Sequence, residues 1–334
     1  PRMTLPSERI ATHLAGRPVL VVGRAGMDIY PVPDGTRIED AKEFVNDVGG
    51  SSGNIAVSIA KQGHEVMLMD AMSDDGVGRF VTRSLGDYGV DTQHCFVTTG
   101  LERTSLAMAE TTTDSPDVTI YRNDAADLAI TPAHAEAVDV ASLGAIIITG
   151  TALSREPSRS ACARLVELAA DAGCPVALDI DYRAQGWADA GEAREVLAGL
   201  ARRVDMAVGN DEEFDLIAGG DGRAFAATLA SAGALVLYKM GEGGCDIMEN
   251  GSETHVGIFR VTALKPFGSG DAFLGTSMAS LAAGPGIVAA VTRGAAAAAI
   301  AVSRRGCARA MPTAAEIDGF MDRSPMETDV RKPD

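Results

Sequence analysis

Short apolar runs alternate with segments of helical period along most of the chain. The runs are residues 18–22, 64–71, 145–149, 175–181, 206–209 and 235–240, and the clearest helical segments are residues 158–172 and 190–203. The runs are apolar throughout rather than at every second position, which is typical of parallel strands that are buried on both faces. The pattern therefore predicts an α/β fold, a three-layer α/β/α core with a mostly parallel sheet.

Two segments interrupt this alternation. Residues 28–48 and residues 96–125 each have the pattern of a β-hairpin, and neither has a partner in the predicted sheet. We expect them to pair into a small β-sheet that covers one end of the main sheet as a lid. Residues 245–259 predict a further hairpin, and residues 273–303 predict two buried helices. Since no repeat or Pro/Ser-rich linker divides the chain, we expect residues 1–334 to form a single domain.

The charge balance of the 334 residues is strongly acidic. Lys and Arg number 29 against 46 Asp and Glu, which gives a formal net charge of −17. Such a field repels nucleic acids and anionic membranes, so we expect neither as a partner. With 46% hydrophobic and 22% charged residues, the composition excludes collagen-like and disordered proteins.

The five cysteines are typical of reduced thiols. They are Cys95, Cys162, Cys174, Cys245 and Cys307, an odd number, scattered and without a CxxC pair. The first 18 residues lack the apolar stretch of a secretory signal. We therefore expect a cytoplasmic protein.

Polar residues follow several predicted strands at the point where each strand ends. They are Gly23 to Asp28, then Asp179, Asp181 and Arg183, then Asn210 and Glu213, and finally Lys239 and Gly241. Ligands of an open parallel α/β sheet bind beyond the carboxyl ends of its strands. We therefore expect the chemistry of the protein at this edge.

The most informative segment is Gly268-Ser269-Gly270-Asp271, which directly precedes an apolar helix. Small residues there let backbone N–H groups point at an anion, and the helix dipole adds to the attraction. Asp271 would lie in the first helical turn, where it could accept the proton of a hydroxyl that attacks a phosphoryl group. Taken alone, the segment is more often a helix cap with a glycine turn.

Three other motifs have both a structural and a functional interpretation. Gly49-Gly50-Ser-Ser-Gly-Asn54 precedes a helix and offers close backbone approach with one amide side chain, although a glycine turn is usually structural. Asn210 and Glu213 share one face of a predicted helix and could hold hydrated Mg²⁺, but an acidic first turn also complements the helix dipole. Lys239 to Gly244 is a glycine-rich turn that suits either a nucleotide or a hairpin.

Together the four motifs resemble the PfkB, or ribokinase-like, carbohydrate kinases. GGSSGN at 49–54 is similar to the family's N-terminal signature, NDEE at 210–213 to its Asn-x-x-Glu motif, KMGEGG at 239–244 to its nucleotide turn, and GSGDAF at 268–273 to its Gly-Ala-Gly-Asp signature, with Ser269 in place of the usual Ala. The resemblance covers nearly the whole chain. It implies a ribokinase-like fold with a β-sheet lid and an ATP-dependent kinase.

The resemblance also implies roles for individual residues. Asp271 would be the general base, and the backbone N–H groups of Gly268, Ser269 and Gly270 would stabilise the transferring phosphoryl group. The nucleotide would lie against Lys239, Gly241, Gly244, Gly268 and Gly270, while Asn210 and Glu213 organise Mg²⁺ through water. Asp28 and Asn54 would bind sugar hydroxyls, with Gly49 and Gly50 packed against the sugar.

Residues 23–31, 121–127 and 179–183 resemble the branch of the family that phosphorylates keto-deoxy sugar acids. In that branch an Arg holds the substrate carboxylate, a role that would fall to Arg183, joined by Arg122, with Tyr121 and Arg122 as substrate-binding residues of the lid. An Arg presents a planar fork that pairs with a carboxylate through two hydrogen bonds. The alternatives are an ion pair of Arg183 with Asp179 or Asp181, and Arg122 as a surface residue of the lid.

The substrate that this resemblance implies is 5-dehydro-2-deoxy-D-gluconate, a compound of inositol catabolism, phosphorylated on its terminal hydroxyl. The alternative acid is 2-keto-3-deoxygluconate, and a neutral sugar comes third. A non-catalytic sugar-acid sensor is disfavoured by the intact Asp271 and its glycine loop. A dinucleotide-dependent oxidoreductase is the weakest alternative, because Gly23-Arg-Ala-Gly26 is only a partial fingerprint.

Two further expectations concern a cation and the oligomeric state. Lys265-Pro-Phe stands where many members of the family have an Asp-Thr-Thr run, so a monovalent-cation site is left open. The lid is expected to close over the site and exclude water. Its exposed apolar face predicts a homodimer that forms through the lid.

Overall fold

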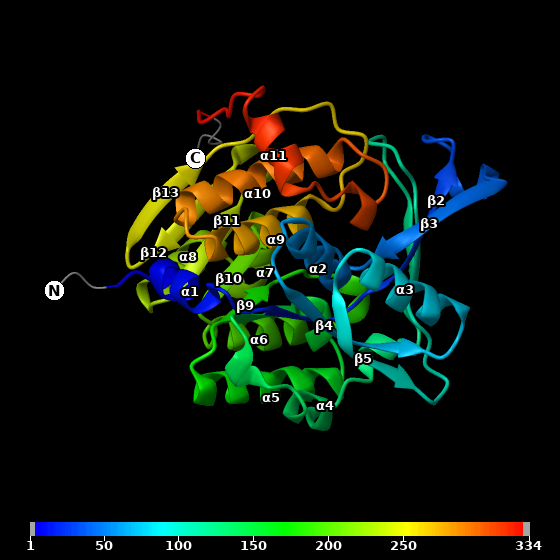
Figure 1. The fold of residues 1–334 in the computed structure, drawn as a ribbon, viewed down its shortest axis with the longest axis horizontal. Coiled ribbons are helices and arrows are strands. Elements are labelled where there is room, and N and C mark those ends of the chain that lie inside the picture. Colours follow the sequence, from blue (N-terminus) through cyan, green and yellow to red (C-terminus); the bar gives the residue numbers. More distant parts are fainter. Residues whose placement is uncertain (1–3, 330–334) are drawn as a thin grey trace.

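The main sheet has nine strands in a computed structural model that describes residues 4–329 (Figure 1). They are β1 (Val19–Val22), β4 (Val66–Ser73), β5 (Asp91–Thr98), β8 (Ala145–Thr149), β9 (Val176–Asp179), β10 (Met206–Asn210), β11 (Leu235–Lys239), β12 (Cys245–Glu249) and β13 (Ser252–Val256). Their order across the sheet is β13-β12-β11-β10-β9-β8-β1-β4-β5. All neighbours from β11 to β5 pair in parallel, whereas the pairs β11–β12 and β12–β13 are antiparallel.

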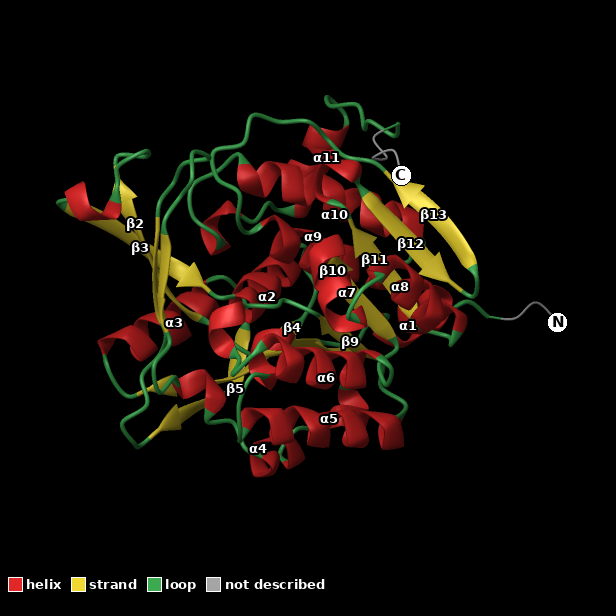
Figure 2. Ribbon diagram, turned by 180° about the vertical axis from the view of Figure 1, so that it is seen from behind, coloured by secondary structure: helices red, strands yellow, loops and turns green. Residues whose placement is uncertain are grey.

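Helices cover both faces of this sheet, as the apolar runs predict (Figure 2). One face carries α1 (Pro6–Leu14), α2 (Ser51–Lys61), α3 (Gly76–Asp87), α9 (Ser269–Ala282), α10 (Ile287–Val302) and α11 (Ala314–Met321). The other face carries α4 (Pro132–Glu136), α5 (Ser158–Ala172), α6 (Ala190–Ala201), α7 (Asp211–Ala218) and α8 (Gly222–Ser231). The three-layer α/β/α architecture is therefore confirmed.

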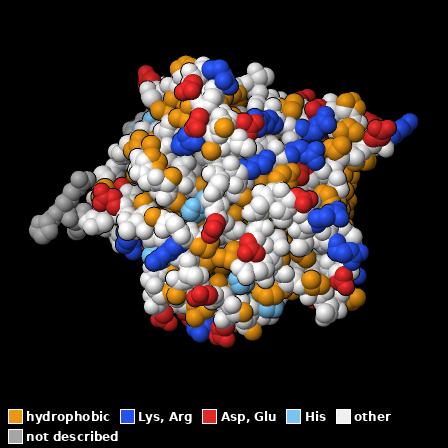
Figure 3. Space-filling view, viewed as in Figure 1, with side chains coloured by type: hydrophobic (Ala, Val, Ile, Leu, Met, Phe, Trp, Pro, Cys, Tyr) orange, Lys and Arg blue, Asp and Glu red, His pale blue; other side chains and the backbone are white. Residues whose placement is uncertain are grey.

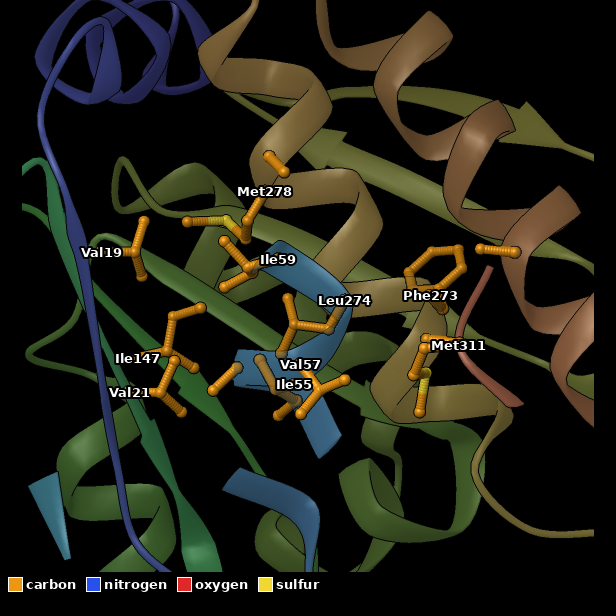
Figure 4. Close-up of a cluster of buried hydrophobic side chains, with 14 of the residues drawn as sticks. Val19, Val21, Ile55, Val57, Ile59, Ile147, Phe273, Leu274, Met278 and Met311 are labelled. Carbon is orange, nitrogen blue, oxygen red and sulfur yellow. The ribbon is translucent and has the colours of Figure 1, made fainter. Parts of the chain in front are cut away.

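Strand β1 shows why its sequence is apolar at every position. Val19 and Val21 point into the core under α2 and α9, whereas Leu20 and Val22 point into the core on the opposite face. Successive side chains of a strand point to opposite faces, so a strand covered on both sides buries all of them. Figure 4 shows the first of these cores, where Val19 and Val21 face the apolar side chains of α2 and α9.

Helices α2 and α9 approach each other closely. A Cβ on Gly275 would lie 2.5 Å from the Ser58 Cβ and 2.7 Å from the Ile55 carbonyl oxygen, so only glycine permits this contact. Leu274 and Met278 of α9 fill the space beside it (Figure 4). The contact fixes the first turn of α9 next to the first turns of α2.

The small sheet forms from the two segments that interrupt the α/β alternation. Its strands are β2 (Gly26–Val32), β3 (Glu43–Gly49), β6 (Leu106–Ala109) and β7 (Val118–Tyr121), in the order β3-β2-β6-β7. β2–β3 and β6–β7 are antiparallel hairpins, and β2 joins them by pairing in parallel with β6. The buried Glu110 carboxylate ties the hairpins together, because it accepts hydrogen bonds from Arg37 and from the backbone N–H groups of Ile38 and Asp117.

The boundaries of the lid differ from the prediction at one point. Residues 96–98 belong to β5, which pairs in parallel with β4 at the edge of the main sheet. The sequence of β5 is half polar, which is why an apolar-run criterion does not find this edge strand. The hairpin of β12 and β13 and the helices α9 and α10 form as predicted.

The described residues also bear on location and thiol chemistry. Among residues 4–329, no helix is both long and apolar enough to cross a bilayer. All five cysteines are unpaired.

Candidate active site

A cavity of about 660 Å³ lies at the carboxyl ends of β9, β10 and β11, beside the first turn of α9. This is within the range of small-molecule sites. Ten of the predicted site residues line it: Arg183, Asn210, Glu213, Lys239, Gly241, Gly244, Gly268, Ser269, Gly270 and Asp271. Four separate stretches of sequence thus meet in one hollow, at the edge of the sheet where ligands were expected.

The first turn of α9 forms an open anion-binding end. Gly268 is the N-cap residue, with φ +86°, and no side chain caps this end of the helix. Uncapped N–H groups in a first helical turn favour an anion. A Cβ on Gly270 would lie 3.4 Å from the Lys239 Nζ, so that ammonium group lies directly beside the turn. Asp271 is not the helix cap, so the simpler interpretation of the segment fails.

Asp271 faces Asn54 across the contact between α9 and α2. The Asn54 Nδ2 donates a hydrogen bond of 2.8 Å to the Asp271 Oδ2. Burial, together with the nearby Asp181 carboxylate, raises the pKa of Asp271 to about 6. The Asn54 hydrogen bond and the cations Arg183 and Lys239 oppose this rise. Asp271 is therefore ionised at neutral pH, yet far more basic than an ordinary carboxylate.

Lys239 is held among carboxyl groups. Burial lowers its pKa, but Asp179, Glu213 and Asp271 outweigh that effect, so the pKa of Lys239 is raised overall. Burial also raises the pKa of Asp179 well above its usual range. The ammonium group therefore stays charged next to the α9 turn, as a site for phosphate requires.

Asn210 and Glu213 form a reciprocal cap at the start of α7. The Asn210 Oδ1 accepts from the Glu213 N–H and the Glu213 Oε2 accepts from the Asn210 N–H, each at 2.8 Å. The pair therefore caps the helix, as the structural interpretation predicts, and both residues also line the cavity. Within residues 4–329, no group of three His, Cys, Asp or Glu side chains is placed to hold a metal ion. This donor set fits a hydrated Mg²⁺ held mainly by water and phosphate oxygens.

Arg183 is both paired and accessible. Its Nη2 lies 3.0 Å from the Asp181 Oδ1, so the ion-pair alternative is realised, but its side chain is 57% exposed and lines the cavity. Asp181 is itself buried, with φ +35°, and accepts a hydrogen bond from Thr151. Its carboxylate therefore orients a guanidinium that still reaches the solvent-filled hollow.

Four other predicted residues form a buried cluster beyond the cavity. The Asp28 Oδ2 accepts a hydrogen bond of 3.0 Å from the Tyr30 hydroxyl, while Asp28 Oδ1 and Asn54 Oδ1 have no hydrogen-bond partner among residues 4–329. A Cβ on Gly49 would overlap the Asp28 carboxylate, and one on Gly50, with φ +86°, would lie 2.5 Å from the Arg24 carbonyl oxygen. Two buried acceptors without partners suit a ligand rich in hydroxyl groups.

Tyr121 and Arg122 lie away from the cavity. Tyr121, at the end of β7, is exposed. Arg122 forms a mostly buried ion pair with Asp127 and donates a hydrogen bond of 3.1 Å to the Thr151 carbonyl oxygen. Arg122 is therefore not the surface residue of the alternative interpretation; in this arrangement it anchors the end of the small sheet to the core.

Sequence reasoning missed the apolar wall of the cavity and one buried lysine. Phe259 and Val261 form part of the wall, together with Ala295, Ala298 and Val302 of α10. The spacing of the three α10 residues places them on one helix face, a signal that was present but is common in buried helices. Lys265 lines the cavity and is fully buried, which a sequence does not reveal.

Comparison with known proteins shows the family of the chain. A family model described as pfkB family carbohydrate kinase matches residues 17–314. The chain belongs to the pfkB family of carbohydrate kinases. It is accordingly an ATP-using carbohydrate kinase, and the predicted ribokinase-like fold is confirmed.

Individual pfkB relatives agree with this assignment. A protein of Photobacterium profundum named 5-dehydro-2-deoxygluconokinase is 37% identical over 314 residues, which cover 91% of this chain and 94% of that protein. A ribokinase II structure from E. coli with ATP and Mg²⁺ superposes with a TM-score of 0.83 at 21% identity, covering 92% and 99% of the two chains. A fructokinase double mutant of Vibrio cholerae O395 with fructose, ADP and potassium ion has a TM-score of 0.81 at 22% identity, with the same coverage.

Replacing Gly49 with Ala should impair the pfkB kinase reaction. The new methyl group must displace the Asp28 carboxylate, and a displacement of about 1 Å in a site can cost about 10²-fold in rate. We expect kcat/KM for the sugar to fall by at least about tenfold. The matched control is Gly86→Ala in α3, where a Cβ meets nothing within 4 Å. Equal loss in both variants, or no loss in Gly49→Ala, would contradict the role of this contact.

Proposed function

We propose that this kinase transfers the γ-phosphoryl group of ATP to the terminal hydroxyl of 5-dehydro-2-deoxy-D-gluconate. The observation that carries the proposal is Asp271, a carboxylate with a pKa of about 6, which lies in the first turn of α9 beside Lys239. The relatives of that name, of which the Photobacterium profundum protein is 37% identical, support the substrate. A reaction of this kind draws on cytoplasmic ATP, so we expect the enzyme to act in the cytoplasm.

In the proposed mechanism Asp271 removes the proton of the attacking hydroxyl. The backbone N–H groups of Gly268, Ser269 and Gly270 stabilise the negative charge on the phosphoryl group as it is transferred. The ammonium group of Lys239 adds a fixed positive charge at the same place. Asn54 orients the base through its hydrogen bond to Asp271.

The two substrates take different parts of the site. ATP lies in the cavity, with its base against the apolar wall and its phosphates near Lys239, Gly241, Gly244 and the α9 turn. Asn210 and Glu213 would hold Mg²⁺ through water, and the ion would supply positive charge that neutralises the phosphates. The sugar lies against Gly49 and Gly50, where Asp28 and Asn54 have acceptor atoms without partners.

The carboxylate of the sugar acid is assigned to Arg183. Its guanidinium is oriented by Asp181 and remains exposed toward the cavity.

The small sheet would close over the sugar and exclude water, bringing Tyr121 and Arg122 toward the sugar. In Figure 3, Lys and Arg side chains gather toward the small-sheet side of the visible face, although the net charge of the chain is −17. Basic side chains that line the cavity, among them Arg183, Lys239 and Lys265, favour two anionic substrates.

The activity should depend on the ionisation of Asp271. Because the raised pKa is about 6 and the carboxylate is the active form, kcat/KM should be constant above that pH and fall about tenfold per pH unit below it.

Asp271→Asn should lower kcat by about 10³-fold while ATP affinity stays nearly unchanged. A pH series of initial rates and a nucleotide titration measure both effects. Asp87→Asn, at an exposed position of α3, is the control; full activity of Asp271→Asn would exclude the base.

The substrate is tested by ADP release with 5-dehydro-2-deoxygluconate, 2-keto-3-deoxygluconate, fructose, ribose and adenosine. We expect the first compound to have the highest kcat/KM. Arg183→Ala should raise KM for the acid by about 10- to 100-fold, which corresponds to the loss of a charged hydrogen-bonded pair, and affect neutral sugars far less. Preference for 2-keto-3-deoxygluconate would change the proposed substrate and leave the kinase reaction and the role of Arg183 intact. Activity confined to neutral sugars would refute the role of Arg183, and no activity at all would favour a sensor.

We also infer that the enzyme is a homodimer that forms through the small sheet. Val118 and Ile120 on β7 and Phe44 on β3 are exposed apolar side chains of that sheet. Sedimentation velocity at assay concentration should therefore show a dimer, and Ile120→Lys should convert it to a monomer. Leu101→Lys, at an exposed loop position outside the small sheet, should leave the dimer intact. A monomeric wild-type protein would contradict the proposal.

A further inference from the structure

Lys265 is a charged side chain in an unusual environment. It is fully buried, and its Nζ donates a hydrogen bond of 2.5 Å to the Phe267 carbonyl oxygen. Within residues 4–329 it forms no ion pair with a carboxylate. Lysine is almost never fully buried unless it is paired, because removing its charge from water is costly.

The ammonium group lies directly under the anion-binding turn. A Cβ on Gly268, the N-cap residue of α9, would lie 3.2 Å from the Lys265 Nζ. The other charged or titratable groups that act on it are Cys307, Asp271 and Asp28. Lys265 is therefore close enough to be affected by the carboxyl groups assigned to the sugar and to the base, and it lies beside the turn assigned to the phosphoryl group.

Its hydrogen bond constrains the shape of that turn. By holding the Phe267 carbonyl oxygen inward, Lys265 fixes the peptide that leads into Gly268, whose left-handed φ of +86° directs the following N–H groups. The positive end of α9 lies beside the same ammonium group, and two like charges without an anion repel each other. The arrangement therefore gains stability when an anion arrives, which is what a phosphoryl-transfer site requires.

We propose that Lys265 is a positioning residue that acts as an internal cation of the anion-binding turn, and that this kinase consequently needs no monovalent metal ion. The proposal rests on phosphoryl transfer at this turn as the proposed function. The ammonium group holds residues 265–270 in the shape that points their N–H groups at the phosphoryl group. It also adds positive potential there as a compact point charge, although burial lowers the pKa of this lysine and Cys307, Asp271 and Asp28 oppose that effect.

The first test needs no variant. Initial rates of the wild-type enzyme with Mg-ATP are measured at equal ionic strength in potassium, sodium and tetramethylammonium chloride. We expect kcat to agree within about twofold, because the positive charge is built into the chain. Activation by potassium of more than fivefold over tetramethylammonium would overturn the proposal.

The second test separates an electrostatic role from a merely structural one. Lys265→Ala should lower kcat by about 10²-fold, the scale of losing one preorganised charged or hydrogen-bonding group, and change KM for the sugar by less than threefold. Methylammonium or potassium added to Lys265→Ala should restore activity by at least tenfold, whereas neutral acetamide should not. Loss of activity without cation-specific recovery would show that Lys265 is only structural.

Lys61 provides the matched control. Its ammonium group also holds a loop through backbone carbonyl oxygens, those of Ala308, Arg309 and Met311, but it does not line the cavity. Lys61→Ala should leave kcat within threefold of the wild type and show no recovery with methylammonium.

If Lys265→Ala fails to fold, Lys265→Arg and Lys265→Met are compared instead. Lys265→Arg keeps a cation and should therefore retain more activity than the apolar Lys265→Met. Equal activity of those two variants would contradict the proposal.

The tests of Lys265 can still be interpreted if the proposed substrate is wrong. They use whichever sugar of the panel the wild-type enzyme accepts, since the turn acts on the phosphoryl group and not on the sugar. A different sugar would therefore overturn the substrate and leave the Lys265 tests intact. Potassium dependence with the expected sugar acid would overturn the proposal for Lys265 and leave the proposed substrate intact.

Discussion

The close packing of α9 on α2 is the contact on which the site depends. Gly275 removes the one side chain that would hold the two helices apart, and the apolar side chains shown in Figure 4 fill the interface around it. The first turns of both helices then meet at the sheet edge. That meeting places the Asn54 amide 2.8 Å from the Asp271 carboxylate, although 217 positions separate them. A cavity left in this interface would therefore misplace the base as well as cost stability.

Around this contact, carboxyl groups outnumber the ammonium group that they surround, and bound substrates would balance these charges. Asp179, Glu213 and Asp271 surround the single ammonium group of Lys239, and burial raises the pKa of Asp179 and Asp271. No three of the described His, Cys, Asp and Glu side chains are placed to hold a metal ion by themselves, whereas the α9 turn with Lys239 favours phosphate. Under the proposed function, a phosphate that brings its hydrated metal would complement both the carboxyl groups and the turn. This explains why the same edge of the sheet carries both signs of charge without pairing them all.

The sequence predicted the parts of this arrangement that depend on local pattern. Buried strands have continuous apolar runs, so β8 (Ala145–Thr149) and helix α5 (Ser158–Ala172) match the predicted ranges. Glycine-rich segments before helices likewise marked Gly49 and Gly268. What sequence could not show was which charged side chains become buried and which groups they then bond to, because burial depends on the packing of distant segments against one another. Arg122 finds Asp127 and the Thr151 carbonyl oxygen, and Lys265 finds a carbonyl oxygen in the core, where lysine is rarely found.

The two sheets divide the site into parts with different freedom to move. The nucleotide half is built on β9, β10, β11 and α9, which belong to the main sheet and its helical layer. The groups proposed to bind the sugar are divided between the two sheets, since Asp28 lies on β2 and Gly49 ends β3, whereas Asn54 lies on α2 and Arg183 follows β9. A movement of the small sheet would therefore shift Asp28 and Gly49 relative to Asn54, Arg183 and the α9 turn. Closure over the sugar would then complete the site around a phosphate-binding end that is already formed, so the order of assembly follows from the topology of the fold.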